Sequence, residues 1–173
     1  VGEANTGLGN YALANNTTSD FSTAVGYQAL FTNTTGANNV AVGKDCLLLN
    51  TTASNNTAMG AFSLKANTTG TANVAIGNDC MDSNTTGSKN TAVGTDALQA
   101  NTTADFNTAI GNDALGLNLS GASNTAVGKN ALESNTTASS GTAMGKDALG
   151  ANTTGANNTA IGHDCMTSNT TGA

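Results

Sequence analysis

Hydrophobic and polar positions recur along this chain with a fixed spacing of 17 residues. A short apolar segment ends in a glycine in every unit, and ten units of 17 make 170 of the 173 residues without insertion or deletion. These glycines are Gly9, Gly26, Gly43, Gly60, Gly77, Gly94, Gly111, Gly128, Gly145 and Gly162. A period of this size is typical of a solenoid, in which each unit buries its apolar face against neighbouring units.

The residues before each glycine alternate in a way that predicts a short β-strand. Residues 90–93 read Asn-Thr-Ala-Val, and the other units are close variants. Because successive side chains of a strand point to opposite faces, the Thr and Val positions share one face and Ala shows on the other. Thr gives way to Val at Val40 and Val74, which favours an inward position for that face. A Leu or Met five residues after the Val position predicts a second apolar column in the core.

The Ala position is the most restricted one in the strand. Nine units have Ala and the first has Gly7. A solvated strand position should vary, so we expect another chain to approach this face too closely for a larger side chain. The predicted interface consists of Ala24, Ala41, Ala58, Ala75, Ala92, Ala109, Ala126, Ala143 and Ala160. The alternative is a very thin coil in which both faces of the strand lie inside.

Each unit ends in an Asn that is followed in nearly every copy by two Thr residues. This Asn column includes Asn33, Asn50, Asn67, Asn84, Asn101, Asn118, Asn135 and Asn152. Stacked coils place equivalent residues about 4.7–4.9 Å apart, a spacing at which Asn amides form a hydrogen-bonded ladder. Asn also adopts positive φ and forms Asx turns. We therefore expect a ladder of Asn at a corner of each coil, and a second corner with positive φ at the Gly column.

These patterns predict an all-β protein, a β-solenoid or parallel β-roll of ten 17-residue coils that forms a side-by-side homotrimer. Thr, Asn and Gly are weak helix formers, which disfavours a helical repeat. Residues 1–173 form a single array. Val1-Gly2 matches the Thr-Gly that ends a unit, so we expect a segment of a longer fibre.

Composition narrows the choice of partners. Charged residues make up 9% of the chain, the net charge is -6, and Lys and Arg together number five. A nucleic-acid partner needs clustered cations, so none is expected. No run of about 18 apolar residues occurs, so membrane insertion is not expected either.

The repeated motif Asn-Thr-Ala-Val/Ile-Gly-x-x-Ala-Leu-x-x-Asn-Thr-Thr-Gly resembles the repeats of phage-type tail-fibre-domain proteins. Residues 39–43, Asn-Val-Ala-Val-Gly, and 73–77, Asn-Val-Ala-Ile-Gly, are similar to the head repeats of trimeric autotransporter adhesins. The resemblance covers essentially the whole chain. It implies a left-handed parallel β-roll, three chains packed side by side, and a role in surface attachment. The adhesin-head unit is shorter, so the 17-residue coil has an added corner.

An acidic column is the first candidate for chemistry. Asp79, Asp113 and Asp164 each follow a glycine of the repeat by two residues and resemble the Gly-x-Asp core of calcium-binding RTX repeats. That motif carries more glycines and occurs twice per coil, and Tyr11 and Phe62 interrupt the column here. The alternative is an Asx residue in a turn. No metal and no cofactor is expected.

Catalytic residues are scarce. His163 is the single His, in a variable column, and Cys46, Cys80 and Cys165 share a column of small residues. Cys46 and Cys80 lie two coils apart, beyond the reach of a disulfide, so we expect packing thiols. The Asn-Thr-Thr copies match the glycosylation acceptor Asn-x-Ser/Thr, or are turn residues that form the motif by coincidence. No enzyme is expected.

The sequence therefore predicts a structural fibre shaft of an extracellular, cell-surface or virion tail-fibre-like adhesin. Its partners are further copies of itself and, through a tip or along its flank, a host-surface glycan. The alternative is a monomeric β-solenoid that binds a repetitive surface such as ice or glycan. Ice binding needs a flat Thr array, and an inward Thr column would leave only the Asn-Thr-Thr corner to provide it.

Overall fold

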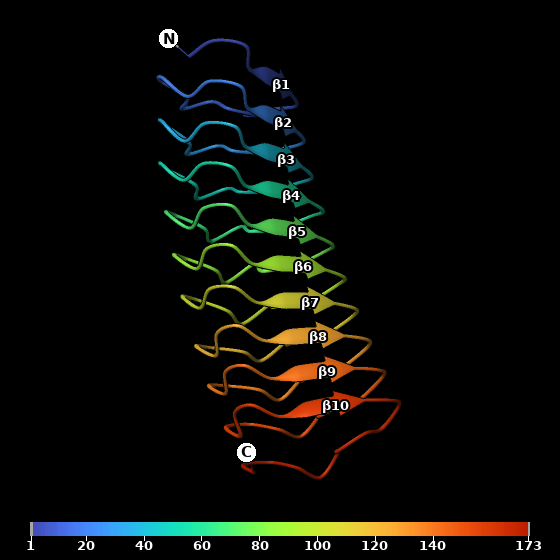
Figure 1. Ribbon diagram of the computed structural model, residues 1–173. Coiled ribbons are helices and arrows are strands. Elements are labelled where there is room, and N and C mark those ends of the chain that lie inside the picture. The colour runs from blue at the N-terminus through green and yellow to red at the C-terminus, as the bar shows by residue number, and fades with distance from the viewer. Residues whose placement is uncertain (1, 173) are drawn as a thin grey trace.

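The computed structural model describes residues 2–172 as one stack of similar coils, each contributing one short strand to the same side (Figure 1). The strands are β1 (Thr6–Leu8), β2 (Thr23–Val25), β3 (Val40–Val42), β4 (Thr57–Met59), β5 (Val74–Ile76), β6 (Thr91–Val93), β7 (Thr108–Ile110), β8 (Thr125–Val127), β9 (Thr142–Met144) and β10 (Thr159–Ile161). They form one ten-stranded sheet in sequence order. Residues 2–172 contain no helix.

Neighbouring strands pair in parallel, with equivalent residues of successive coils side by side. Ala92 of β6 lies beside Ala109 of β7, and Val93 lies beside Ile110. The register therefore advances by one 17-residue unit at every step. This confirms the predicted all-β parallel solenoid with 17-residue coils.

The orientation of the strands is opposite to the prediction. The Ala column points into the coil and is fully buried, whereas the Thr and Val positions on either side are partly exposed. The proposed interface residues therefore lie in the chain's own core: Ala24, Ala41, Ala58, Ala75, Ala92, Ala109, Ala126, Ala143 and Ala160. The restriction to Ala arises because the coil is thin, as the alternative interpretation held, but only the Ala face lies inside and the Thr and Val face does not. These alanines are not available to a partner chain.

The Leu column fills the interior opposite the strands, as predicted. Leu98 and Leu115 are fully buried, as is Met81 in the same column. Residues of this column have φ between 49° and 55°, a left-handed conformation that is unfavourable for a Leu. Complete burial of the side chain, worth about 1.5–3 kcal/mol, offsets that strain. The core thus contains one large apolar column, because the Val/Ile/Met column faces outward.

The predicted Asn ladder is present, but it runs inside the coil. Asn101 Nδ2 donates to Asn84 Oδ1 at 2.8 Å and to the carbonyl of Ala104 at 3.1 Å. The ladder continues in the other coils, and the asparagines from Asn33 to Asn152 are buried. None of them has a positive φ, so the corner predicted at this column forms without the left-handed conformation. The chain bends at the two residues that follow each Asn, and paired amides can be buried without loss.

A second buried Asn column, which the sequence did not single out as a ladder, precedes the strands. Asn56 donates its backbone N–H to Asn39 Oδ1 at 2.9 Å, and its Nδ2 donates to the Gly70 carbonyl at 2.9 Å. The Gly column closes the other end of each strand, with φ between 132° and 146°. A Cβ on Gly94 would lie 2.4 Å from the Gly111 carbonyl oxygen. Only glycine fits this turn, as predicted.

Candidate functional site

The outer face of the sheet is the most regular exposed surface of the molecule. It carries two parallel columns of side chains, since each strand directs its first and third residues outward. We call the third-residue column the apolar stripe: Leu8, Val25, Val42, Met59, Ile76, Val93, Ile110, Val127, Met144 and Ile161. The first-residue column, here called the threonine column, is Thr6, Thr23, Val40, Thr57, Val74, Thr91, Thr108, Thr125, Thr142 and Thr159.

The apolar stripe is partly exposed along its whole length. Ile110 and Met144, in the interior of the array, are 41% and 44% exposed. Neither column contains a charged residue. The two columns therefore form an uncharged surface in which apolar side chains and hydroxyl groups repeat at the spacing of the coils.

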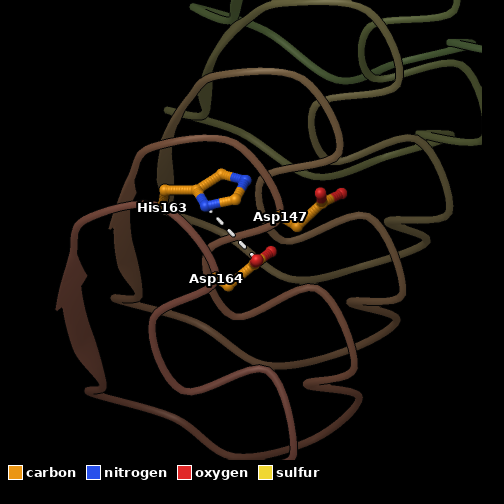
Figure 2. Close-up of side chains that lie close together, drawn as sticks. All are labelled: Asp147, His163 and Asp164. Atoms are coloured by element: carbon orange, nitrogen blue, oxygen red, sulfur yellow. Dashed lines mark ion pairs between the residues drawn. The ribbon is translucent and has the colours of Figure 1, made fainter.

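A second candidate is a group of potential metal ligands at the C-terminal end of the acidic column, shown in Figure 2. One ligand atom from each of Asp147, His163 and Asp164 lies within 4.8 Å of the other two. His163 Nδ1 is 3.2 Å from Asp164 Oδ2. An imidazole and two carboxylates suit a divalent transition metal, so these three residues are the ones that would hold a cation.

The Asp147 carboxylate already has partners on both oxygens. Lys146 Nζ is 2.5 Å from Oδ2, and Asn130 Nδ2 donates to Oδ1 at 2.8 Å. The hydrogen bonds from Lys146 and Asn130 lower the pKa of Asp147. A metal ion would have to displace the lysine. The His163–Asp164 pair drawn in Figure 2 and the Lys146–Asp147 pair beside it are therefore best described as surface ion pairs.

The rest of the acidic column has a shared conformation. Every residue of the column has a positive φ, from Tyr11 to Asp164, which Asp and Asn tolerate better than other side chains. In the middle of the array, the pKa of Asp96 is raised. Burial is the main cause, and the nearby negative charges of Asp113 and Asp79 add to it. These findings support the turn interpretation of the column.

The cysteines lie where small residues are needed. Cys46 and Cys80 are buried, and their Sγ atoms contact the carbonyl oxygens of Ala58 and Ala92 at 3.2 and 3.4 Å. Burial raises the pKa of both thiols to about 12, so neither is a thiolate at neutral pH. Cys165 is free and partly exposed. His163 is largely exposed and, among residues 2–172, forms an ion pair only with its neighbour Asp164.

An aromatic cluster was missed by sequence reasoning. The rings of Tyr11 and Tyr27 lie 6.3 Å apart, and those of Tyr11 and Phe31 lie 6.1 Å apart. These residues come from three different columns of the repeat, so the 17-residue pattern did not bring them together. The available signal was that four of the chain's six aromatic residues lie within residues 11–31.

The described residues contain neither an enclosed cavity nor a membrane-spanning helix. Residues 2–172 form no ligand pocket. The same residues include no helix of the length and apolar character needed to cross a membrane. No protein-family model, curated protein or solved structure matches the chain.

Proposed function

We propose that the chain is a structural fibre shaft in which three copies pack side by side through the apolar stripe. The observation that carries the proposal is the continuous exposure of this uncharged apolar column over ten coils. Large contiguous apolar patches are rare on monomeric proteins and mark interaction surfaces. The stripe replaces the Ala column as the surface on which the copies meet.

The geometry of the stripe suits a second copy of the same chain. Every copy has the same coil spacing, so apolar side chains of adjacent copies can interdigitate in register over the full length. A closed, symmetric assembly buries the same surface of every subunit, and three rods around a threefold axis bury a narrow stripe on each. The resemblance to tail-fibre and adhesin-head repeats supports this arrangement, together with an extracellular or virion location and a role in attachment rather than catalysis.

The test compares two pairs of lysine substitutions in the same two coils. Val93→Lys with Ile110→Lys places charges in the apolar stripe, whereas Thr95→Lys with Asn112→Lys places them on the exposed wall beyond the Gly turn. Light scattering should give three chains for the wild-type protein and the second pair, and one chain for the first pair. A monomeric wild type, or an assembly that withstands the first pair, contradicts the proposal.

A second candidate function is binding to a repetitive surface such as ice, and the orientation of the threonine column favours it. The sequence-based objection was that these threonines face inward, but they face outward beside the apolar stripe. Coils six to ten carry an unbroken run of Thr in this column. A monomeric wild-type protein that lowers the freezing point of water below its melting point (thermal hysteresis) would establish ice binding. A trimeric wild-type protein without thermal hysteresis would exclude it.

A further inference from the structure

The position two residues after each glycine shows which side chains the turn requires. Seven of the ten coils have Asp or Asn there, and the exceptions are Tyr11, Gln28 and Phe62. Tyr11 has a φ of 62°, a conformation that an aromatic residue adopts at a cost and that Asn adopts readily. Its side chain is 56% exposed, so burial does not offset that cost as it does for the Leu column. Tyr11 therefore departs from the residue types that this turn favours, and its contacts indicate why an aromatic residue occupies the position.

Tyr11 is the centre of the aromatic cluster. Its ring stands at 79° to that of Tyr27 and at 85° to that of Phe31, both edge-to-face contacts. Such contacts fix the orientation of each ring. Tyr27 is 46% exposed, so about half of each tyrosine is open to a ligand. The three rings form a rigid apolar surface with two hydroxyl groups.

Two polar residues adjoin Tyr27, one along the chain and one in the next coil. Gln28 follows Tyr27 in the chain, and the backbone N–H of Asp45 donates to the Tyr27 carbonyl at 2.9 Å. Asp45 is only 8% exposed, and its Oδ1 has no hydrogen-bond partner among residues 2–172. A buried acceptor without a partner is costly. The Asp45 carboxylate thus holds an unsatisfied acceptor in the coil next to Tyr27.

We propose that Tyr11, Tyr27 and Phe31, with Gln28 and Asp45 at their border, bind a neutral saccharide. A pyranose ring combines an apolar C–H face, which stacks on aromatic rings, with hydroxyl groups that pair with carboxylate and amide oxygens. Charged ligands fit less well, because Lys44 Nζ lies 3.7 Å from Asp45 Oδ2 and the two charges offset each other. The aromatic cluster of Tyr11, Tyr27 and Phe31, here called the platform, lies within one chain, so it does not depend on the proposed assembly.

The site is a surface and not a pocket, because residues 2–172 form no pocket. A single platform buries little of a sugar and binds weakly. Several copies held on one fibre would bind a glycan-coated surface more tightly through avidity. This agrees with the flank-bound glycan that the sequence suggested.

The experiment uses the intrinsic fluorescence of the chain. Its two tyrosines are both in the platform and it has no tryptophan, so a change in tyrosine emission reports on this site alone. The full chain is titrated with neutral gluco-, manno- and galacto-oligosaccharides, with sialylated and sulfated glycans for comparison, and the labelled chain is applied to an array of the same glycans. We expect a neutral saccharide to change the emission and to retain the chain on the array.

Two variants locate the binding. Tyr11→Asn restores the residue type that the turn favours, so it should weaken array binding by about tenfold or more, as for loss of a central aromatic contact, while the melting temperature stays equal or rises. The matched control is Phe106→Asn, another exposed aromatic residue at positive φ, which should leave binding unchanged. Blank arrays, binding restricted to charged glycans, or binding that survives Tyr11→Asn would each overturn the proposal.

Discussion

The small space inside a thin coil limits which side chains fit at the buried positions of this chain. Cys46 and Cys80 occupy a column that most coils fill with Ala, and their thiols are buried with a pKa of about 12. At pH 8 we therefore expect a thiol reagent to label one cysteine per folded chain, Cys165, and all three after denaturation. Mass spectrometry of the labelled peptides measures this. Labelling of Cys46 and Cys80 at the rate of Cys165 would contradict their burial.

The same thiols make stability depend on alkaline pH. Their ordinary pKa of 9.0 is raised to about 12 in the folded chain, so above pH 9 the unfolded state binds fewer protons than the folded state. The stability that the two protonated thiols contribute is fully present below pH 9 and is lost as the pH rises from 9 to about 12. The melting temperature of the wild type should fall more steeply over this range than that of a Cys46→Ala, Cys80→Ala double variant. Parallel curves would show that the thiols make no such contribution.

At the scale of the strand, the inward Ala column sets the width of the coil. Ala109 is fully buried between its neighbours in β6 and β8. Ala109→Leu overfills the interior and should destabilise the fold by about 1–3 kcal/mol. Val127→Leu, on the partly exposed outer face, should have a small effect. Urea denaturation of both variants measures the difference. A stable Ala109→Leu chain that only loses its partners would restore the original interface interpretation.

Much of the coil could be predicted from the sequence. The repeat length, the strand, the parallel register, the Leu column and the Asn ladder all follow from recurrence every 17 residues and from stacking. The inward face could not be predicted, because alternation defines two faces and does not say which is buried. The rule that apolar residues face inward and small invariant ones mark an interface fails here. The interior already holds the Leu column and two Asn columns, and only Ala fits beside them.

The candidate sites were harder to predict than the coil. Tyr11, Tyr27 and Phe31 occupy three different positions of the repeat, so their proximity depends on the path of the chain between columns. The apolar stripe was recognised as a column and assigned to the core. Because the structure buries the Ala column, the apolar stripe and the threonine column face outward and are partly exposed.

At the scale of the whole molecule, the array should behave as a stack of units that contact only their neighbours, since each coil pairs with the one before and the one after. Deleting residues 85–101 removes 17 residues and joins Asn84 to Thr102, which restores the Asn-Thr sequence of an ordinary coil. The apolar stripe, the Leu column and both Asn ladders then continue without interruption. We expect one cooperative urea transition, with an m-value lower by about a tenth because one coil fewer is exposed on unfolding.

Deleting residues 85–100 instead is the matched control. It leaves one coil with an extra residue, so the strand after the junction and the ladder before it cannot both remain in register. Side chains near the junction would be displaced from their faces, and buried Asn amides would lose partners, which is costly in a core. Two transitions, or a single one at a clearly lower urea concentration, are expected. Equal stability of the two deletions would show that the 17-residue register does not hold the stack together.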